Sequence, residues 1–187
     1  MFDKHLLRKS ALKVRLAMVK DDKEQYDQKI INFITNNDDF QKAKIIGLFS
    51  PIRGEVNVNL LISFCFNNDK IVALPRMQDD NSLLFYQITS FDDLVIDNNY
   101  NILQPNLQCK MLMTSEINIC FLPFLAYDSN GTRVGYGKGY YDRTLVDFKN
   151  PIIGIGYSWQ KTIEEITVDK NDILMHQVIT KIGIEKF

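Results

Sequence analysis

The segment from 128 to 143 concentrates residues that could bind an anion. It reads DSNGTRVGYGKGYYDR and holds four of the chain's nine glycines. Alternating glycines let backbone N–H groups approach an anion closely, and a helix predicted to begin near Tyr140 would add its positive end. Arg133 and Lys138 bring mobile positive charge to the same loop, as a polyphosphate requires. A tight glycine-rich turn is the alternative, but the two cations and the following helix favour a phosphate-binding loop.

This loop matches neither of the two common nucleotide-binding motifs. Thr132 stands where the Walker A pattern needs its first glycine, and Gly139 follows Lys138 where that pattern needs Ser or Thr. Tyr140 occupies the third glycine position of the Rossmann pattern. The glycines and charges, rather than a known motif, therefore carry the prediction.

A second candidate group follows the predicted strand 45–49 and reads SPIRGE over residues 50–55. Glu55 is predicted to open the next helix, where a carboxylate can serve as a plain cap that complements the helix dipole. It could instead bind a ligand that presents adjacent N–H donors, because a carboxylate accepts two parallel hydrogen bonds. Position alone favours the cap.

The third candidate is the pair Asn171-Asp172, just before the last predicted strand. Alone, the pair is an ordinary turn. Beside a nucleotide site, Asp172 becomes a candidate ligand for Mg²⁺, which takes few carboxylates and completes its shell with water and phosphate.

Short apolar runs and helical stretches must position these residues. Clusters of Asn and Asp, such as 36–39 and 97–99, mark the loops between them. Strands are predicted near 45–49, 71–75, 84–88, 117–124, 152–157 and 178–184. Helices are predicted near 3–19, 22–35, 57–66 and 140–148. Alternating strands and helices with runs this apolar predict one α/β domain over 1–187, with three layers and a mostly parallel central sheet flanked by helices.

Composition excludes several classes of protein. The 187 residues carry a net charge of −1, which gives no basic field for nucleic acid or an anionic membrane. Three cysteines without CxxC spacing (Cys65, Cys109 and Cys120) argue against a disulfide framework or a zinc site and read as small core residues of a cytoplasmic protein. Only His5 and His176 are present, so a histidine metal cluster is excluded, and both are predicted to be structural or surface residues.

The basic N-terminal stretch has charges in every apolar run, so it does not resemble a signal peptide. An apolar stripe of Leu7, Ala11, Val14 and Met18 could mark a membrane-surface helix. A helix packed on its own domain is the favoured interpretation, and no stretch is apolar enough to span a membrane.

Taken together, the motifs resemble the 5-formyltetrahydrofolate cyclo-ligase family, also called methenyltetrahydrofolate synthetases. The resemblance covers nearly the whole chain, and its most specific part is GTRVGYGKGYYDRTL at 131–145. The other matching segments, in the family's order, are KHLLR (4–8), FSPIRGEV (49–56), ALPRM (73–77), NILQP (101–105), FLPFLAYD (121–128), IGIGYSWQ (153–160) and NDILMHQVIT (171–180). The chain departs from the family in having Asn171 before Asp172, with the histidine later at His176, and Lys138 where bacterial members commonly have glycine.

The resemblance implies a reaction in which 5-formyltetrahydrofolate and ATP give 5,10-methenyltetrahydrofolate, ADP and phosphate. The formamide carbon is a poor electrophile, so the γ-phosphoryl group is transferred to its oxygen, N10 attacks the resulting iminium phosphate, and phosphate leaves. Such a transfer needs positioning and charge neutralisation by Mg²⁺, backbone donors and cations. It requires no histidine base or cysteine nucleophile.

The resemblance also implies roles for individual residues. Asp142 and Asp172 would face Mg²⁺, and Lys138 and Arg133 would meet the transferred phosphoryl group. Ser50, Glu55 and Tyr100 would bind folate, with Glu55 on the pterin N–H edge. The implied ATP-binding residues are Lys4, Arg8, Arg133, Val134, Gly135, Tyr136, Gly137, Lys138, Gly139, Tyr140 and Tyr141. ATP and folate would be the only partners, without nucleic acid or membrane, and the protein is predicted to be a monomer.

Two other functions remain open from the sequence alone. One is a small transferase or isomerase that acts on a phosphorylated metabolite, which would explain the glycine loop but not Glu55 or the acidic pair. The other is a nucleotide- or folate-binding module without turnover. Formation of methenyltetrahydrofolate only when both ATP and 5-formyltetrahydrofolate are present would separate the three.

Overall fold

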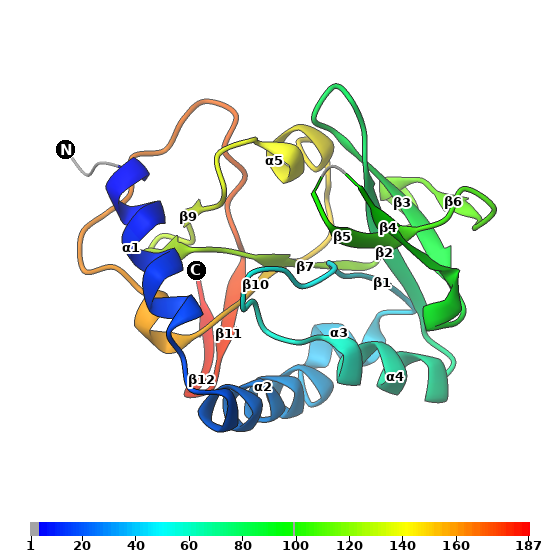
Figure 1. Cartoon of the computed structure of the whole chain (residues 1–187), viewed down its shortest axis with the longest axis horizontal. Helices are drawn as coiled ribbons and strands as arrows, with labels where there is room; N and C mark the ends of the chain where they lie inside the picture. The colour runs from blue at the N-terminus through cyan, green and yellow to red at the C-terminus, as the bar shows by residue number, and fades with distance from the viewer. Residues whose placement is uncertain (1–3, 99) are drawn as a thin grey trace.

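A computed structural model describes residues 4–98 and 100–187, and its centre is a sheet of eight strands in the order β12-β11-β10-β7-β1-β2-β3-β6 (Figure 1). These strands are β1 (Ile45–Gly47), β2 (Ile71–Met77), β3 (Leu83–Ile88), β6 (Met111–Leu112), β7 (Ile119–Pro123), β10 (Ile152–Ile155), β11 (Gln177–Thr180) and β12 (Gly183–Lys186). The helices are α1 (Lys4–Leu16), α2 (Lys20–Thr35), α3 (Asp38–Lys42), α4 (Asn59–Asn67) and α5 (Tyr140–Thr144). Two small two-stranded ribbons pair β4 (Leu94–Asp97) with β5 (Ile102–Pro105), and β8 (Ala126–Tyr127) with β9 (Arg133–Val134).

The five inner strands, β11, β10, β7, β1 and β2, are parallel to one another. Strands β3 and β6 extend one edge in antiparallel pairing, and β12 does the same at the other edge. A parallel sheet is buried on both faces, which explains why the inner strands read as nearly continuous apolar runs. The predicted mostly parallel α/β sheet is confirmed.

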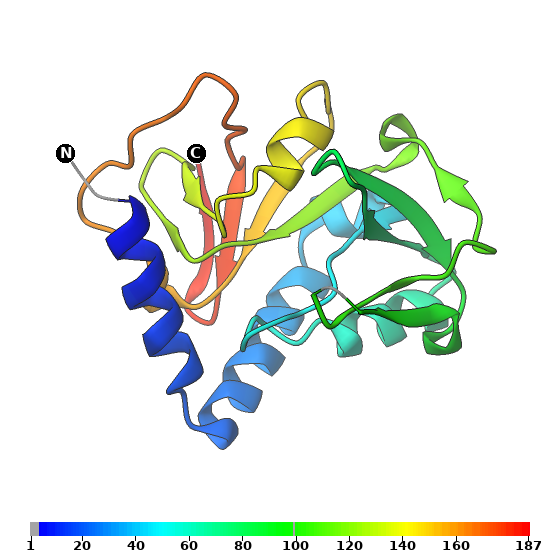
Figure 2. The same cartoon turned by 45° about the horizontal axis from the view of Figure 1, so that its top comes forward.

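Strand β7 shows how the two faces divide. Ile119 and Phe121 point into the core under α2, α3 and α4, whereas Cys120 and Leu122 point into the core under α5. In Figure 1 the helices α2, α3 and α4 lie together on one side of the sheet. Figure 2 shows α5 and the chain leading to it on the other side. The three predicted layers are therefore present, although the second helical layer is thin.

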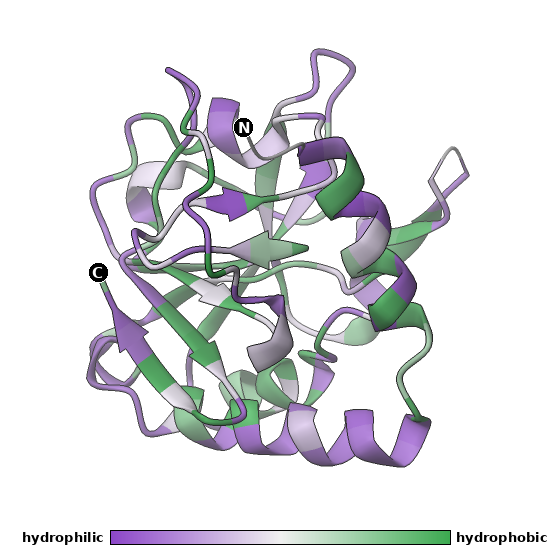
Figure 3. Cartoon of the chain, turned by 90° about the vertical axis from the view of Figure 1, so that its left-hand side faces the viewer, coloured by the Kyte–Doolittle hydropathy of each residue, from purple (hydrophilic) through white to green (hydrophobic). Residues whose placement is uncertain are grey.

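Helix α1 lies beside the β8–β9 ribbon, and α2 turns its hydrophobic side toward the sheet (Figures 2 and 3). The predicted stripe on α1 is only partly buried, because Ala11 is buried whereas Val14 is 49% exposed. Arg15 is buried instead. Among the described residues, no helix has the length and apolarity needed to cross a bilayer.

Several predicted boundaries were wrong. The segment predicted as the strand 178–184 is a hairpin of β11 and β12, because the chain turns at Lys181 and Ile182, and Gly183 opens β12 with a φ of 140°. The helix predicted over 140–148 ends at Thr144, and the loop predicted over 36–39 contains the start of α3, where Asn37 caps the N–H groups of Asp39 and Phe40. Residue 3 of the first predicted helix and Asn99 of the predicted loop 97–99 lie outside the described residues.

Gly154 on β10 offers a test of how closely the core under α5 packs, because Phe124 and Met175 of that core lie beside it. A Cβ added there would lie 2.8 Å from Cε1 of Phe124 and even closer to Sδ of Met175. We therefore expect Gly154→Ala to lower the free energy of unfolding by about 1–3 kcal/mol through overpacking. Gly135 has open space around it, so Gly135→Ala should change that free energy by no more than about 0.5 kcal/mol. Urea unfolding measures both, and equal stability of the two variants would contradict this packing.

Candidate functional site

Three segments converge at the carboxyl ends of β1 and β7: the loop after β1, the chain after β7, and α1. Strands β1 and β7 are neighbours, but the chain leaves β1 toward β2 on one side and β7 toward β10 on the other. Such a switch point opens a crevice beside the strand ends, where open α/β sheets bind their ligands. The fold therefore brings the 50–55 segment and the glycine loop to the same end of the sheet.

A pocket of about 400 Å³ opens beside the loop after β1. Its walls combine the polar 50–59 loop with apolar side chains around the β4–β5 ribbon, including Phe91, Leu94 and Leu103. Two buried polar atoms of the 50–55 segment have no hydrogen-bond partner, namely Oγ of Ser50 and Oε1 of Glu55. Buried polar groups are normally hydrogen-bonded, so these two atoms set the 50–55 segment apart from the rest of the pocket wall.

Glu55 does not cap a helix, and that prediction was wrong. Helix α4 begins at Asn59, four residues later, and Oε2 of Glu55 instead accepts a hydrogen bond of 2.9 Å from the backbone N–H of Ile52. Burial raises the pKa of Glu55 to about 7, although the Ile52 N–H, Arg15, Tyr136 and Arg53 all favour the charged form. Glu55 is thus a buried carboxyl group that changes charge near neutral pH, and its Oε1 makes no hydrogen bond to the described residues.

Arg15 is a site residue that the sequence reasoning missed. Its guanidinium is buried and donates hydrogen bonds to the carbonyl oxygens of Arg53 and Phe124, each at 3.0 Å, and to the hydroxyl of Tyr136. One of its nitrogens, Nη2, lies 3.8 Å from Oε1 of Glu55. The residue type alone does not indicate burial, because arginine on a helix is usually exposed. The spacing does indicate it, since Arg15 follows Ala11 by one turn and lies on the same buried face of α1.

Arg8 from α1 and Arg143 from α5 contact the backbone of the glycine loop, where Arg143 donates to the carbonyl of Lys138. Arg8 donates a hydrogen bond of 2.9 Å to the carbonyl of Gly135, and its guanidinium lies where a side chain on Gly137 would be. Gly137 and Gly139 have φ angles of 93° and 68°, which glycine adopts without strain. Lys138, between them, is exposed, and its side chain makes no hydrogen bond or ion pair within the described chain. Its amine is therefore free to meet an incoming phosphate.

Arg133, predicted as a mobile cation, is held by hydrogen bonds in the structure. It donates a 2.8 Å hydrogen bond to Oδ1 of Asp142 and another to the carbonyl of Ile173, and its side chain is 6% exposed. These bonds tie β9 to α5 and to the loop before β11. The structure thus shows Arg133 as a link between three segments, and its contact with a phosphoryl group stays a prediction.

Lys4, a predicted ATP-binding residue, contacts the turn that contains the predicted metal ligand Asp172. Its amine lies 2.8 Å from Asp169 and 3.2 Å from Asp172. Burial lowers the pKa of Lys4, but the two carboxylates outweigh that effect and raise it. Lys4 and Arg8 lie one turn apart on α1, so the same face of this helix reaches both the 169–172 turn and the glycine loop.

The predicted Mg²⁺ ligands are compatible with a site that is completed by phosphate. Oδ1 of Asp142 accepts bonds from Arg133 and from the N–H of Ile173, which leaves its Oδ2 for a cation. Asp172 already faces Lys4. The described residues contain no group of three acidic, histidine or cysteine side chains that could hold a metal alone. Mg²⁺ commonly binds through one or two carboxylates plus substrate phosphates, so the residues fit a metal that arrives with a nucleotide.

Tyr100 connects the pocket to the glycine loop. It is 52% exposed at the tip of the β4–β5 ribbon, next to Asn101, which lines the pocket. Partial burial and the nearby Tyr100 hydroxyl raise the pKa of Tyr140, which directly follows the glycine loop. Tyr141 packs between the two core layers, and Val134 is buried in β9, so these two predicted ATP residues support the loop from within.

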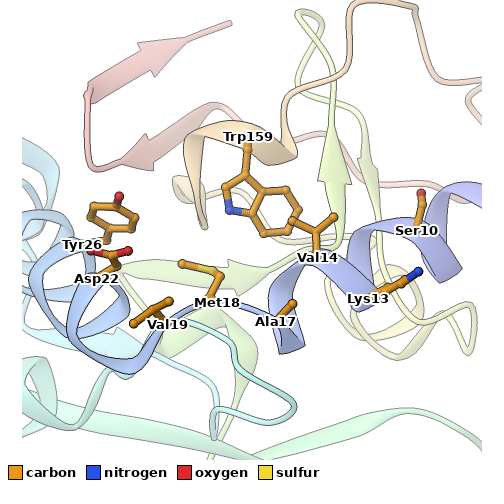
Figure 4. A pocket seen from close by; sticks show the side chains of 9 residues that line it. All are labelled: Ser10, Lys13, Val14, Ala17, Met18, Val19, Asp22, Tyr26 and Trp159. Carbon is orange, nitrogen blue, oxygen red and sulfur yellow. The ribbon is translucent and has the colours of Figure 1, made fainter.

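Other candidates are structural. Cys65 and Cys120 are buried as predicted, and Cys109 is half-buried. His176 accepts a hydrogen bond of 3.0 Å on Nδ1 from the N–H of Ile152. A separate apolar hollow of about 570 Å³ lies between α1, the start of α2 and Trp159, and none of the predicted site residues lines it (Figure 4).

The chain is similar to known proteins over nearly its whole length. A model of the 5-formyltetrahydrofolate cyclo-ligase family matches residues 1–181. The 5-formyltetrahydrofolate cyclo-ligase of Mycoplasma pneumoniae is 32% identical over 166 residues, which cover 85% of this chain and 88% of that protein. The enzyme of the same name from Mycoplasma genitalium is 31% identical over 186 residues, which cover 96% and 98%.

Two solved structures share the fold. The 5,10-methenyltetrahydrofolate synthetase of Aquifex aeolicus has a TM-score of 0.87 at 28% identity, covering 98% of this chain and 92% of that one. The synthetase of Mycoplasma pneumoniae has a TM-score of 0.79 at 27% identity, covering 96% and 99%. The predicted ligase resemblance is thereby confirmed, and the chain belongs to the 5-formyltetrahydrofolate cyclo-ligase family.

Proposed function

We propose that the protein cyclises 5-formyltetrahydrofolate to 5,10-methenyltetrahydrofolate, using ATP with Mg²⁺ and releasing ADP and phosphate. The observation that carries this proposal is the polar pair Ser50 and Glu55 in the pocket wall, whose buried Oγ and Oε1 have no hydrogen bond within the described residues. A pterin edge carries adjacent N–H donors and a flat ring. The carboxylate matches the donors, and the apolar walls around β4–β5 match the ring.

The position of the glycine loop beside this pocket supports the nucleotide part of the proposal. The ring of Tyr136 lies under the guanidinium of Arg53, 5.4 Å from its carbon, and Arg53 lines the pocket. Lys138 is free to meet the terminal phosphates, and Arg8 and Lys4 hold the loop and the 169–172 turn from the side of α1. The two binding regions therefore share a border at Tyr136 and Arg53.

The chemistry needs the formyl oxygen and the γ-phosphorus in contact, with water excluded. The formyl oxygen attacks the γ-phosphorus and ADP leaves, after which N10 attacks the activated carbon, and phosphate leaves with the proton that N10 gives up. Lys138 would neutralise the transferred charge, and Glu55 would fix the pterin so that N10 reaches the carbon. Mg²⁺, held by Asp142 and Asp172 with the phosphates, would supply further charge neutralisation.

Turnover in solution tests the proposal directly. Absorbance of the methenyl product should appear only when ATP and 5-formyltetrahydrofolate are both present. Product formed without ATP, or binding without product, would contradict it and favour a module without turnover. We further propose that the protein acts as a cytoplasmic monomer, because Cys65, Cys109 and Cys120 are all free and one chain supplies both binding regions.

Lys138→Met tests the role of the free amine. The variant should lower kcat about 10²- to 10³-fold, the scale of losing one donor to a developing charge, while leaving the unfolding temperature unchanged because Lys138 is exposed. Lys149→Met, at another exposed position, is the matched control and should keep full activity. Normal turnover in Lys138→Met would remove this residue from the mechanism.

Asp142→Asn and Asp172→Asn test the metal ligands. A neutral amide is a poorer ligand for a hard cation, so either variant should need a higher Mg²⁺ concentration for half-maximal activity. Binding of ATP without Mg²⁺ serves as the control, because it separates loss of a metal ligand from loss of the ion pairs to Arg133 and Lys4. An unchanged Mg²⁺ titration in both variants would refute metal contact by either carboxylate.

Glu55→Gln should change the free energy of unfolding and the folate affinity in opposite directions at pH 8. Because the pKa of Glu55 is raised to about 7 in the folded protein, its contribution to stability is full below about pH 4.5 and is lost as the pH rises through about 7. At pH 8 the variant should therefore gain on the order of 1–3 kcal/mol in the free energy of unfolding, a gain that disappears at pH 4.

The same substitution should weaken folate binding about 5- to 150-fold, because an amide donor would face a pterin donor. Urea unfolding and calorimetry measure the two effects, and ATP affinity should stay unchanged. Glu164→Gln, at an exposed position, controls for the loss of one surface charge. Unchanged folate affinity would show that Glu55 has only a structural role.

A further inference from the structure

We infer that Arg15 is a positioning residue for substrate binding: its buried guanidinium fixes Glu55 and Tyr136 relative to each other and so sets the substrate pocket against the glycine loop. The inference rests on the proposed function and adds to it a residue outside the lining of the pocket. It concerns how the substrate pocket and the glycine loop are held at a fixed position relative to each other.

The three kinds of guanidinium nitrogen have different partners. Nε donates to the carbonyl of Arg53 in the loop after β1, and Nη1 donates to the carbonyl of Phe124 after β7, each at 3.0 Å. Nη2 donates to the hydroxyl of Tyr136 in the glycine loop and lies 3.8 Å from Oε1 of Glu55. A planar fork can satisfy these directions together, whereas a lysine amine cannot.

The surroundings of Glu55 make Arg15 its buried counter-ion. The groups that face Glu55 are Arg15 on α1, Arg53 on its own loop, and the hydroxyls of Tyr136, Tyr141 and Tyr157. Arg53 is exposed, so water screens its charge, whereas the side chain of Arg15 is 1% exposed. Tyr157 donates its hydroxyl to Asp27, so a second carboxylate lies nearby and opposes ionisation of this tyrosine.

The position of Arg15 therefore has two separable consequences. Its charge keeps Glu55 ionised near neutral pH, and its fork keeps Glu55, Tyr136 and the two carbonyls in one arrangement. Removal of the charge moves the pH at which the pocket loses affinity, whereas loss of the fork at constant charge loosens the pocket without moving that pH.

The test compares Arg15→Gln and Arg15→Lys with wild type, using KM for 5-formyltetrahydrofolate and for ATP between pH 5.5 and 8.5. Arg15→Gln should raise the folate KM at pH 7 about tenfold or more and move the midpoint of its pH profile upward by about one unit. Arg15→Lys should raise the folate KM about tenfold with the midpoint within about 0.3 units of wild type. In both variants the ATP KM should change less than about threefold.

Controls make the outcomes distinct. Lys13→Met, on the exposed side of α1, should leave both KM values and the midpoint unchanged. An unchanged folate KM and midpoint in folded Arg15→Gln, or equal rises in both KM values without a shift of the midpoint, would overturn the inference. Failure of wild type to form product would refute the proposed function itself, because that result does not involve Arg15.

Tyr136→Phe provides a second route if the Arg15 variants do not fold. It removes one hydroxyl and leaves the bonds from Arg15 to the carbonyls of Arg53 and Phe124 in place. A folate KM raised about threefold or more, with an upward shift of the midpoint, supports the inference. A wild-type folate KM and midpoint in Tyr136→Phe would overturn it.

Discussion

The carbonyl groups of Arg53, after β1, and Phe124, after β7, accept hydrogen bonds from side chains rather than from neighbouring strands. Arg15 donates to both carbonyls from α1. This one side chain thereby closes the switch point, where neighbouring strands send the chain in opposite directions. Its bonds join the first helix to the pocket loop, the chain after β7 and the glycine loop.

Among the described residues, Glu55 is the carboxyl group nearest to the buried charge of Arg15, with Oε1 at 3.8 Å from Nη2. The charge balance between them is incomplete, because burial still raises the pKa of Glu55 to about 7, and Oε1 of Glu55 has no hydrogen bond within the part of the chain that the structure describes. In a purely structural pair, further hydrogen bonds would satisfy that oxygen. Residual unsatisfied polarity of this kind is typical of sites that bind something, where stability is given up for function.

The sequence predicts the inner strands well because they are buried on both faces and therefore read as apolar runs, as in β7 and β10. It also locates the glycine loop, whose residues are local in the chain. It fails where long-range contacts decide the outcome. Glu55 has the form of a helix cap, yet α4 starts four residues later, and Arg133 has the form of a free cation, yet it is paired with Asp142. The partners of Arg15 lie between 38 and 121 positions away, so the sequence could indicate its burial but not its contacts.

Helix α1 holds the site through contacts with residues made much later in synthesis. Lys4 meets Asp169 across 165 positions, and Arg8 meets Gly135 across 127. A growing chain from the ribosome therefore carries its first helix without these partners until nearly all of the protein has emerged. The parallel core can begin to assemble earlier from β1 and β2, which are only a few tens of residues apart. The contacts of Lys4 with Asp169 and of Arg8 with Gly135 can therefore form only late in synthesis, after most of the sheet has emerged.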